Sequence, residues 1–392
     1  MRRHILVAAG AFALAAALPI TAQAQAVRGV SDTEIIIGTY TDLSGVTVAW
    51  GVNNSNAIRM VFDDVNAKGG IHGRKIRYIV EDNQYQVPRS IQAANKLINR
   101  DNVFLMIANG GTPMNNAVMP DQLAKGVPNI FPLTSARSMH EPFHKMKFAL
   151  VSSYYDQMRA AVKYLVETQG KKSICAMYQD TDFGRDIMDG VRAQLDAMKL
   201  KLTAEAAHKP TDADFSASVA KLKDAGCDAI LLGTIVRDTH QIMTSIRKIG
   251  WDVTVMNQVA AYDSAVAEVP GGATDGMLCM TSVVFASADD PRPAVQAFVK
   301  NYKQLYGRDP NFAAQIGYTA ATTMIQGLQN AGRNLTVDSF VAGMEQIKGL
   351  QDIFGSPPMT FGPNQRLGSN QSYIAVVKGG KWALAVPNPV GY

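Results

Sequence analysis

Apolar residues recur along the chain at two spacings, and these spacings predict strands and helices in alternation. Residues 35–38 and 103–108 are continuous apolar runs, which are typical of strands buried on both faces of a parallel sheet. Residues 75–81 alternate between apolar and polar side chains, as in a half-buried strand. Residues 52–67 fit an amphipathic helix, whose apolar stripe consists of Ile58, Val61, Phe62 and Val65.

The same alternation continues over most of the chain. Ser90 is expected to cap a second helix. Further strands are predicted at residues 129–133, 147–152, 174–178, 202–207, 229–235, 253–257, 276–283 and 373–378. Further helices are predicted at residues 115–125, 156–167, 185–198, 215–225, 239–249, 293–306, 312–331 and 337–347. Such alternation is typical of doubly wound α/β layers, and two successive series predict two lobes between which the chain crosses more than once.

The first 26 residues have the pattern of a secretory signal peptide. Arg2 and Arg3 form a basic region, residues 5–20 are apolar, and the Ala-Gln-Ala-Gln-Ala run at 22–26 offers small residues for cleavage. The apolar run is short for a membrane span, which needs about 20 residues. We expect cleavage after Ala26 and release of the mature protein into the periplasm.

Length and charge narrow the class of protein. Removal of the first 26 of 392 residues leaves about 366, which is too long for one compact core and suits two lobes. Without Arg2 and Arg3 the 38 basic residues fall to 36, against 33 acidic residues. Because this excess is mild and no basic stripe with interleaved aromatic residues occurs, we expect no nucleic-acid partner.

The cysteines show neither a C-x-x-C motif nor the spacing of a metal site. Cys175, Cys227 and Cys279 lie about 50 residues apart. An exported chain can carry a disulfide, but an odd number leaves at least one thiol. Cys175 and Cys279 lie in strand-like apolar runs, so we interpret both as buried small hydrophobic residues.

Residues 140–144, His-Glu-Pro-Phe-His, match the H-E-x-x-H pattern of zinc metalloproteases. That chemistry requires His140 and His144 on one helical face. Pro142 would remove a backbone donor within that turn and crowd the turn before it. A secreted zinc hydrolase is therefore an alternative function, and we prefer a solvated loop that holds no metal.

Polar residues follow several predicted strands, at the end where open α/β sheets bind ligands. Gly111 and Thr112 lie between a strand and a helix, where unpaired N–H groups and the helix dipole favour an anion. Thr134, Ser135 and Arg137 follow the next strand and offer two hydroxyls and a guanidinium to a carboxylate. Corresponding candidates in the second series are Phe183, Thr234 and Arg237. Each position also suits an ordinary turn, but together they favour a ligand site.

Three aromatic residues are candidates for the walls of that site. Trp50 opens the first helix, where it either lines a cleft or packs against its own helix. Tyr154 and Tyr155 fall near the expected crossing between the lobes, which suits a hinge or a cleft wall.

Residues 66–76, Asn-Ala-Lys-Gly-Gly-Ile-His-Gly-Arg-Lys-Ile, followed by Asp82, resemble the helix–turn–strand signature of the branched-chain amino-acid-type periplasmic binding proteins of ABC importers. Further matching segments are residues 41–45, Pro88, residues 183–184, 306–307, 317–318 and 331–332. The resemblance covers nearly the whole mature chain. It implies a type I fold, in which two doubly wound α/β lobes joined by a three-crossover hinge close on the ligand.

On this basis we expect residues 27–148 and 280–352 to form the N-terminal lobe, and residues 149–279 and 353–392 to form the C-terminal lobe. The resemblance also implies that the loops matching residues 110–112 and 134–137 hold the ligand carboxylate. Trp50 and Phe183 match aromatic positions of the family's site.

One departure from the family concerns the ligand amine. Amino-acid binders of this family hold the ammonium with an acidic residue on the loop that matches residues 255–261, which here contains Gln258 and no carboxylate. Burying an ammonium without a counter-charge is costly. Where the family often has Tyr, the loop 234–237 adds the charge of Arg237 instead. We therefore expect a carboxylate ligand without an α-amino group, with a flat aromatic acid favoured, unless Asp263 reaches the pocket.

The expected partners are this small-molecule carboxylate and a membrane ABC permease, with the protein acting as a monomer. No nucleophile with a base and an orienting group is recognisable, so we expect no enzymatic activity and no cofactor. Two alternatives of the same fold stay open: a binder of branched-chain or other amino acids, and a sensor module that presents ligand to a receptor.

Overall fold

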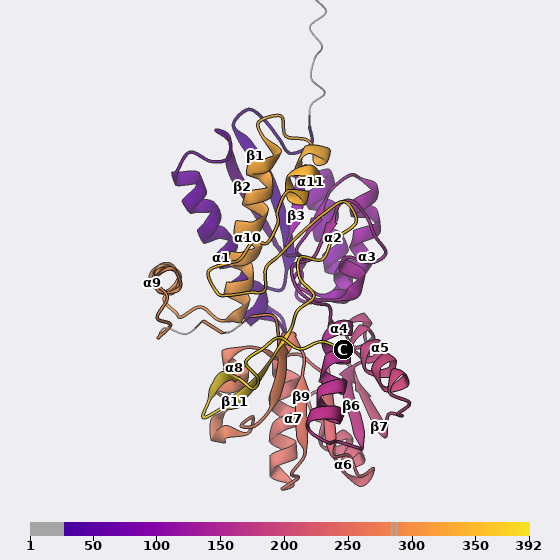
Figure 1. The fold of residues 1–392 in the computed structure, drawn as a ribbon. Coiled ribbons are helices and arrows are strands. Elements are labelled where there is room, and N and C mark those ends of the chain that lie inside the picture. Colours follow the sequence, from indigo (N-terminus) through magenta and orange to yellow (C-terminus); the bar gives the residue numbers. More distant parts are fainter. Residues whose placement is uncertain (1–26, 284, 287–288) are drawn as a thin grey trace, which may run out of the picture.

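The computed structural model describes residues 27–283, 285–286 and 289–392, and it places them in two lobes stacked end to end (Figure 1). The expected signal peptide lies outside these residues. Among the described helices, none combines the length and the apolar character that a bilayer span requires.

The first lobe is built on a parallel sheet with the strand order β2-β1-β3-β4-β5. Its strands are β1 (Glu34–Thr41), β2 (Lys75–Asp82), β3 (Leu105–Ile107), β4 (Asn129–Ile130) and β5 (Lys147–Phe148). Its helices are α1 (Val48–Ala67), α2 (Val87–Asn99), α3 (Thr112–Ala124), α10 (Phe312–Ala331) and α11 (Val337–Glu345). One apolar core joins the sheet to α1, α10 and α11, and another joins it to α2 and α3, so both faces are covered.

The second lobe is built on a sheet with the order β12-β11-β10-β9-β8-β6-β7. Its strands are β6 (Ile174–Gln179), β7 (Ala204–His208), β8 (Ala229–Gly233), β9 (Thr254–Asn257), β10 (Leu278–Thr281), β11 (Tyr373–Lys378) and β12 (Lys381–Leu384). Its helices are α4 (Tyr154–Lys163), α5 (Asp182–Ala197), α6 (Ser216–Asp224), α7 (Val236–Lys248) and α8 (Ser264–Ala267). β6 to β10 run parallel, whereas β11 and β12 are added antiparallel.

The two sheets repeat one winding, which fixes where a ligand can bind. In the first sheet the order reverses between β1 and β3, and in the second between β6 and β8. The reversal leaves a crevice beyond the carboxyl ends of these strands, because the following helices lie on opposite faces. In Figure 1 these ends face each other across the gap between the lobes.

The chain crosses between the two sheets after β5, after β10 and before β11. The first and last crossings run side by side, since Ala149 pairs with Leu367 and the hydroxyls of Ser152 and Ser372 lie 2.5 Å apart. Met359 and Phe361 pack in the core of the first lobe, so the chain re-enters the second lobe later than the expected residue 353. Helix α9 (Pro293–Tyr306) lies beside α1, where the Tyr302 hydroxyl donates to Asn53 Oδ1 at 2.7 Å.

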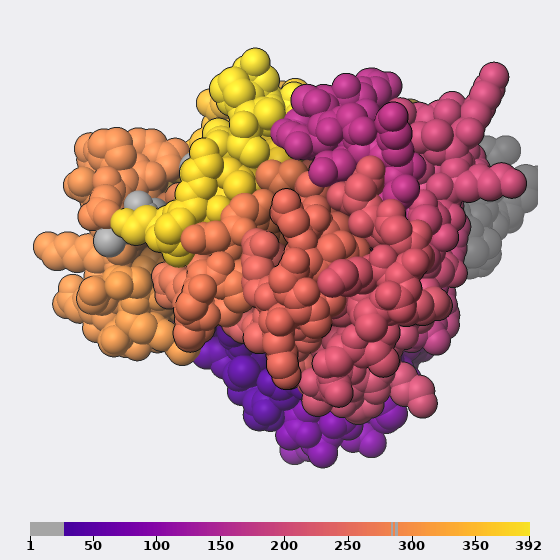
Figure 2. Space-filling model, turned by 90° about the horizontal axis from the view of Figure 1, so that it is seen from below, coloured from indigo at the N-terminus to yellow at the C-terminus, as the bar shows by residue number. Residues whose placement is uncertain are grey.

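The C-terminal segment returns to the second lobe and ends against α4. In Figure 2, which looks at the lower end of the molecule, the yellow C-terminal segment lies beside the magenta segment that contains this helix. The guanidinium of Arg159 lies 3.7 Å from the centre of the Tyr392 ring, and the Tyr392 hydroxyl donates to Asp156 at 2.6 Å. The end of the chain is therefore attached to the helix that follows the first crossing.

Two local predictions are wrong, and one strand was missed. Ser90 does not cap α2, because the helix begins after Gln86 and the Ser90 hydroxyl donates to the Gln86 carbonyl inside it. Cys175 is not an isolated buried thiol, since β6 holds it against Cys227 in a disulfide, while Cys279 is buried and free. The hairpin strand β12 was not predicted, although Trp382, Ala383 and Leu384 form a short apolar run.

Candidate functional site

A cleft that is partly open to solvent lies between the carboxyl ends of the two sheets. Loops after β1 to β5 supply one side of it, and loops after β6, β8 and β9 supply the other. The residues that line it are Thr41, Asp42, Thr47, Trp50, Gly51, Tyr85, Gly110, Gly111, Thr112, Pro132, Leu133, Thr134, Ser135, Ala149, Leu150, Val151, Tyr154, Phe183, Ile235, Val259, Ala260, Phe312 and Ile316. The cleft therefore occupies the crevice that the strand order predicts.

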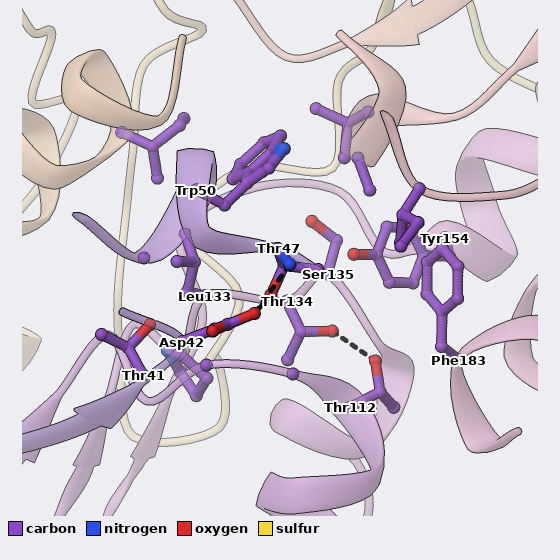
Figure 3. A pocket seen from close by; sticks show the side chains of 18 of the residues that line it. Thr41, Asp42, Thr47, Trp50, Thr112, Leu133, Thr134, Ser135, Tyr154 and Phe183 are labelled. Atoms are coloured by element: carbon purple, nitrogen blue, oxygen red, sulfur yellow. Dashed lines mark hydrogen bonds between the residues drawn. The ribbon is translucent and has the colours of Figure 1, made fainter. Parts of the chain in front are cut away.

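A polar end of the cleft is formed where α3 begins. The hydroxyl of Thr112, the first residue of α3, lies 2.6 Å from that of Thr134 on the loop after β4, as Figure 3 shows. Gly111 precedes the helix with a φ of 88°, and a side chain there would meet the ring of Tyr85 at 3.1 Å. Glycine thus brings the backbone close to the cleft, beside the unpaired N–H groups of the first helical turn.

Asp42 is the one carboxylate among the described residues that line the cleft, and its oxygens are already occupied. One oxygen accepts hydrogen bonds from the backbone N–H groups of Ser44 and Gly45. The other accepts from the backbone N–H and the hydroxyl of Thr47, at 2.7 and 2.8 Å. Four donors fill the acceptor sites of a carboxylate, so Asp42 shapes its own turn before α1.

Aromatic rings form much of the apolar wall. Trp50 meets Phe312 edge-on, with ring centroids 5.9 Å apart, and Tyr154 meets Phe183 in the same way at 5.2 Å. Figure 3 shows Trp50 on one side of the cleft and the Tyr154–Phe183 pair on another. Burial raises the pKa of Tyr154 to about 12, so its hydroxyl is a neutral donor at physiological pH.

The structure brings six of the eleven predicted site residues to the cleft wall and places five elsewhere. Those on the wall are Trp50, Gly111, Thr112, Thr134, Ser135 and Phe183. Those away from it are Arg137, Tyr155, Thr234, Arg237 and Gln258. Arg137 lies over the ring of Tyr155, 4.2 Å from its centre, and turns its guanidinium toward α5.

Three more of the second-lobe candidates away from the wall have partners within their own lobe. Arg237 donates to Asp238 and to the carbonyls of residues 210 and 212, so its charge does not reach the cleft. Thr234 is buried beside Thr239, with hydroxyl oxygens 2.8 Å apart. The Gln258 amide donates to the Thr234 carbonyl and accepts from the Ala260 N–H. These contacts hold the loops after β8 and β9 in place.

Asp263 does not reach the cleft. Its carboxylate caps α8 by accepting from the Ala265 N–H, and it accepts from Asn311 Nδ2 at 2.7 Å. Burial raises the pKa of Asp263 to about 6, although these two hydrogen bonds lower it. The carboxylate that was considered as a possible counter-charge is thus buried between the start of α8 and the start of α10, away from the cleft.

Several residues of the cleft wall were not predicted from the sequence. Tyr85 follows β2 at a strand carboxyl end, a signal that could have identified it. Phe312 and Ile316 come from α10, about 260 residues after Trp50, and no local pattern marks them. Burial raises the pKa of Tyr85 well above its ordinary value, so it presents a neutral hydroxyl.

The zinc-hydrolase alternative requires His140 and His144 on one helix, and the structure does not place them on one. A short 3₁₀ helix, Arg137–Met139, ends at His140, and His144 lies beyond it in a loop. His144 Nδ1 accepts from the Met146 N–H instead of facing His140. Within the described part of the chain, His, Cys, Asp and Glu side chains form no group of three suited to a metal.

Comparison with known proteins gives consistent matches. A family model described as periplasmic binding protein matches residues 34–381. The Leucine-, isoleucine-, valine-, threonine-, and alanine-binding protein of Pseudomonas aeruginosa is 22% identical over 294 residues, which cover 74% of this chain and 76% of that protein.

Solved structures match the fold over nearly the whole chain. A branched chain amino acid ABC transporter protein from Thermus thermophilus with bound valine has a TM-score of 0.83 at 16% identity, covering 93% of this chain and 98% of that one. A fatty acid ABC transporter substrate-binding protein from Thermomonospora curvata has a TM-score of 0.81 at 23% identity, covering 92% and 93%.

Proposed function

The chain belongs to the periplasmic binding protein family, and on that premise we propose that it captures a small organic carboxylate without an α-amino group for an ABC importer. Its fold is the expected two-lobed type I fold. An aromatic acid is the first candidate ligand. The absence of an available counter-charge among the described residues that line the cleft carries this proposal.

The polar end of the cleft suits a carboxylate. Thr112, Thr134 and Ser135 contribute hydroxyls, and the N-terminus of α3 contributes backbone N–H groups and the positive end of a helix dipole. Hydrogen bonds to a charged group are stronger than neutral ones, so neutral donors are sufficient to hold an anion.

The rest of the described cleft wall offers little to an ammonium group. Asp42 has its four acceptor positions filled, and Asp263 accepts from Asn311 at the start of α10, away from the cleft. An ammonium carried into the closed cleft would lose its water without gaining a free carboxylate, which is costly. The relatives named as amino-acid binders therefore share the family of this chain. The cleft, in contrast, favours acids that resemble their ligands but lack the amine.

The apolar wall supports an aromatic or other apolar acid. Trp50, Tyr85, Tyr154, Phe183 and Phe312 come from both lobes, so a flat ring can contact aromatic edges on more than one side when the lobes close. An aliphatic acid would bury its chain against the same wall. A thermal-shift screen determines whether aromatic or aliphatic acids bind more tightly.

Capture would proceed by hinge closure, because a ligand that contacts both lobes stabilises the closed arrangement over the open one. We propose that the mature protein is a periplasmic monomer, cleaved after Ala26, and that the closed form docks to a membrane permease. A sensor partner in place of the permease would leave the cleft unchanged.

A thermal-shift screen of the mature protein tests the ligand class. The panel holds benzoates, hydroxycinnamates, keto acids, dicarboxylates and short fatty acids, each beside its methyl ester or amide, and it includes leucine, isoleucine and valine. A ligand at 100 times its Kd stabilises the protein by about 2.7 kcal/mol, which is readily measured. We expect a hit among the free acids and none among their esters. Stabilisation by the amino acids alone would contradict the proposed ligand class while leaving the binding-protein family intact.

A further inference from the structure

A second set of contacts between the lobes lies outside the cleft, on one face of α5. Asp182, Asp186 and Asp189 follow one another at the spacing i, i+4, i+7, which places them on the same side of the helix. All three carboxylates contact residues of the first lobe. None of the three lines the cleft, so these contacts do not belong to the ligand site.

Two first-lobe residues provide the partners. Asn116 on α3 donates from Nδ2 to Asp182 at 2.9 Å. Arg137 donates its backbone N–H to Asp186 at 3.1 Å, and its guanidinium donates to Asp189 at 3.3 Å and lies 3.7 Å from the Asp186 carboxylate.

The first-lobe partners are held in orientation. The Ser138 hydroxyl donates to Asn116 Oδ1 at 2.8 Å, which leaves the Asn116 amide N–H groups directed at Asp182. The guanidinium of Arg137 lies over the Tyr155 ring at the start of α4, which favours a cation at that place.

Asp186 is the most enclosed member of this set. Its side chain is 12% exposed, against 54% for Asp189. Burial raises the pKa of Asp186 to about 6, while the Arg137 N–H and guanidinium oppose that rise and Asp189 adds to it. The positive charge of Arg137 therefore stabilises the carboxylate of Asp186, which is buried where the two lobes meet.

We propose that Asn116, Arg137 and the aspartates of α5 form an interlobe latch, which is made when the lobes close and slows their reopening. This proposal rests on the proposed function in that closure is what retains a ligand. Since its contacts do not touch the cleft, the latch acts on the closing equilibrium whichever acid is bound. Because affinity differences reside mainly in dissociation rates, the latch sets how long the ligand is held.

The test uses the mature protein without ligand, so its outcome is independent of the ligand class. Asn116→Cys and Asp182→Cys place one thiol on each lobe, and dibromobimane, which fluoresces when it has joined two thiols, reports how often they meet. Cys279 is buried and the other two cysteines form a disulfide, so neither interferes. The rate of cross-linking is compared with and without Arg137→Ala in this background.

We expect Arg137→Ala to slow cross-linking several-fold. Asp189→Asn, which alters an exposed side chain and leaves folding intact, is expected to slow it in the same direction. The matched control is Arg192→Ala on the same helix, whose guanidinium pairs with Glu205 at 2.7 Å within the second lobe and should not change the rate. If the Arg137→Ala and Asp189→Asn variants cross-link as fast as the parent double-cysteine protein, or if no background cross-links, the latch is overturned.

Discussion

The hydroxyl oxygens of Thr112 and Thr134 lie 2.6 Å apart, although they follow different strands of the first sheet. The pair stands at the start of α3, where backbone N–H groups have no partner within the helix. Either hydroxyl can be the donor, so a carboxylate oxygen placed beside them gains a donor after a simple rotation. The loops after β3 and β4 thereby come together at the proposed carboxylate site.

Thr112→Val is expected to weaken binding of the strongest carboxylate of the screen by about 10- to 100-fold, because a hydrogen bond to a charged group contributes about 1.5–3 kcal/mol. Valine keeps the shape of the side chain and removes the hydroxyl. Calorimetric titration of that carboxylate measures the change. Thr322→Val is the control, since that hydroxyl bonds to the carbonyl of Tyr318 in its own helix. Equal affinities of the Thr112 variant and the wild type would count against the anion site.

Phe183→Leu is expected to lower affinity for aromatic acids more than for aliphatic acids of similar size. A ring–ring contact contributes about 0.5–1.5 kcal/mol beyond buried area, so the aromatic-to-aliphatic affinity ratio should fall by about 2- to 10-fold. The two affinities are measured side by side for the variant, the wild type and Phe143→Leu. Phe143 is 53% exposed and does not line the cleft, which makes it a suitable control. An unchanged ratio would favour an aliphatic ligand.

Reduction of Cys175–Cys227 is expected to lower the free energy of unfolding by about 3–4 kcal/mol, because the bond closes a loop of 52 residues in the unfolded chain. Denaturant unfolding with and without reductant measures this loss. The double variant Cys175→Ala and Cys227→Ala should behave like the reduced wild type and should not respond to reductant. A response to reductant in the double variant would show that another bond is responsible.

Asp263 is expected to make stability depend on pH between about 4 and 6. Burial raises its folded-state pKa to about 6, so the folded protein binds the proton more tightly than the unfolded chain does. The resulting stabilisation is present below about pH 4 and is lost as the pH rises through about 6, by an amount on the order of 2–3 kcal/mol.

Asp263→Asn tests this dependence, since the amide is neutral throughout and still accepts from the Ala265 N–H. The difference in unfolding free energy between wild type and variant should fall from pH 4 to pH 7. Thr322→Val, which changes no ionisable group, should give a constant difference. A constant difference for Asp263→Asn as well would mean that its carboxyl titrates normally in the folded protein.

The sequence was sufficient for the fold because periodicity is a local signal. The predicted bounds 293–306 and 312–331 coincide with α9 and α10, whose apolar positions repeat at helical spacing. Gly111 and Thr112 were likewise found from a local rule, that a strand end followed by a helix start favours an anion.

The contacts of long polar side chains could not be predicted from local sequence patterns. Arg137 and Arg237 follow strand ends like their neighbours, yet neither guanidinium reaches the cleft. Arg137 turns to a carboxylate of α5 in the other lobe, and Arg237 turns to the adjacent Asp238 and to the carbonyls of residues 210 and 212. Phe312 reaches the cleft because α10 packs along α1, a contact between segments about 260 residues apart. Cys175 pairs with Cys227 because β6 is adjacent to β8, an order that no spacing of cysteines encodes.

The claim that the ligand lacks an α-amino group is tested most directly by calorimetric titration of matched pairs. The mature protein is titrated with 3-phenylpropanoate and phenylalanine, and with 4-methylpentanoate and leucine, so that each pair differs by the amine alone. Our account predicts that within a pair the member without the amine binds at least about 100-fold more tightly, which corresponds to about 2.7 kcal/mol. Stoichiometric binding of leucine or phenylalanine with equal or greater affinity would contradict it.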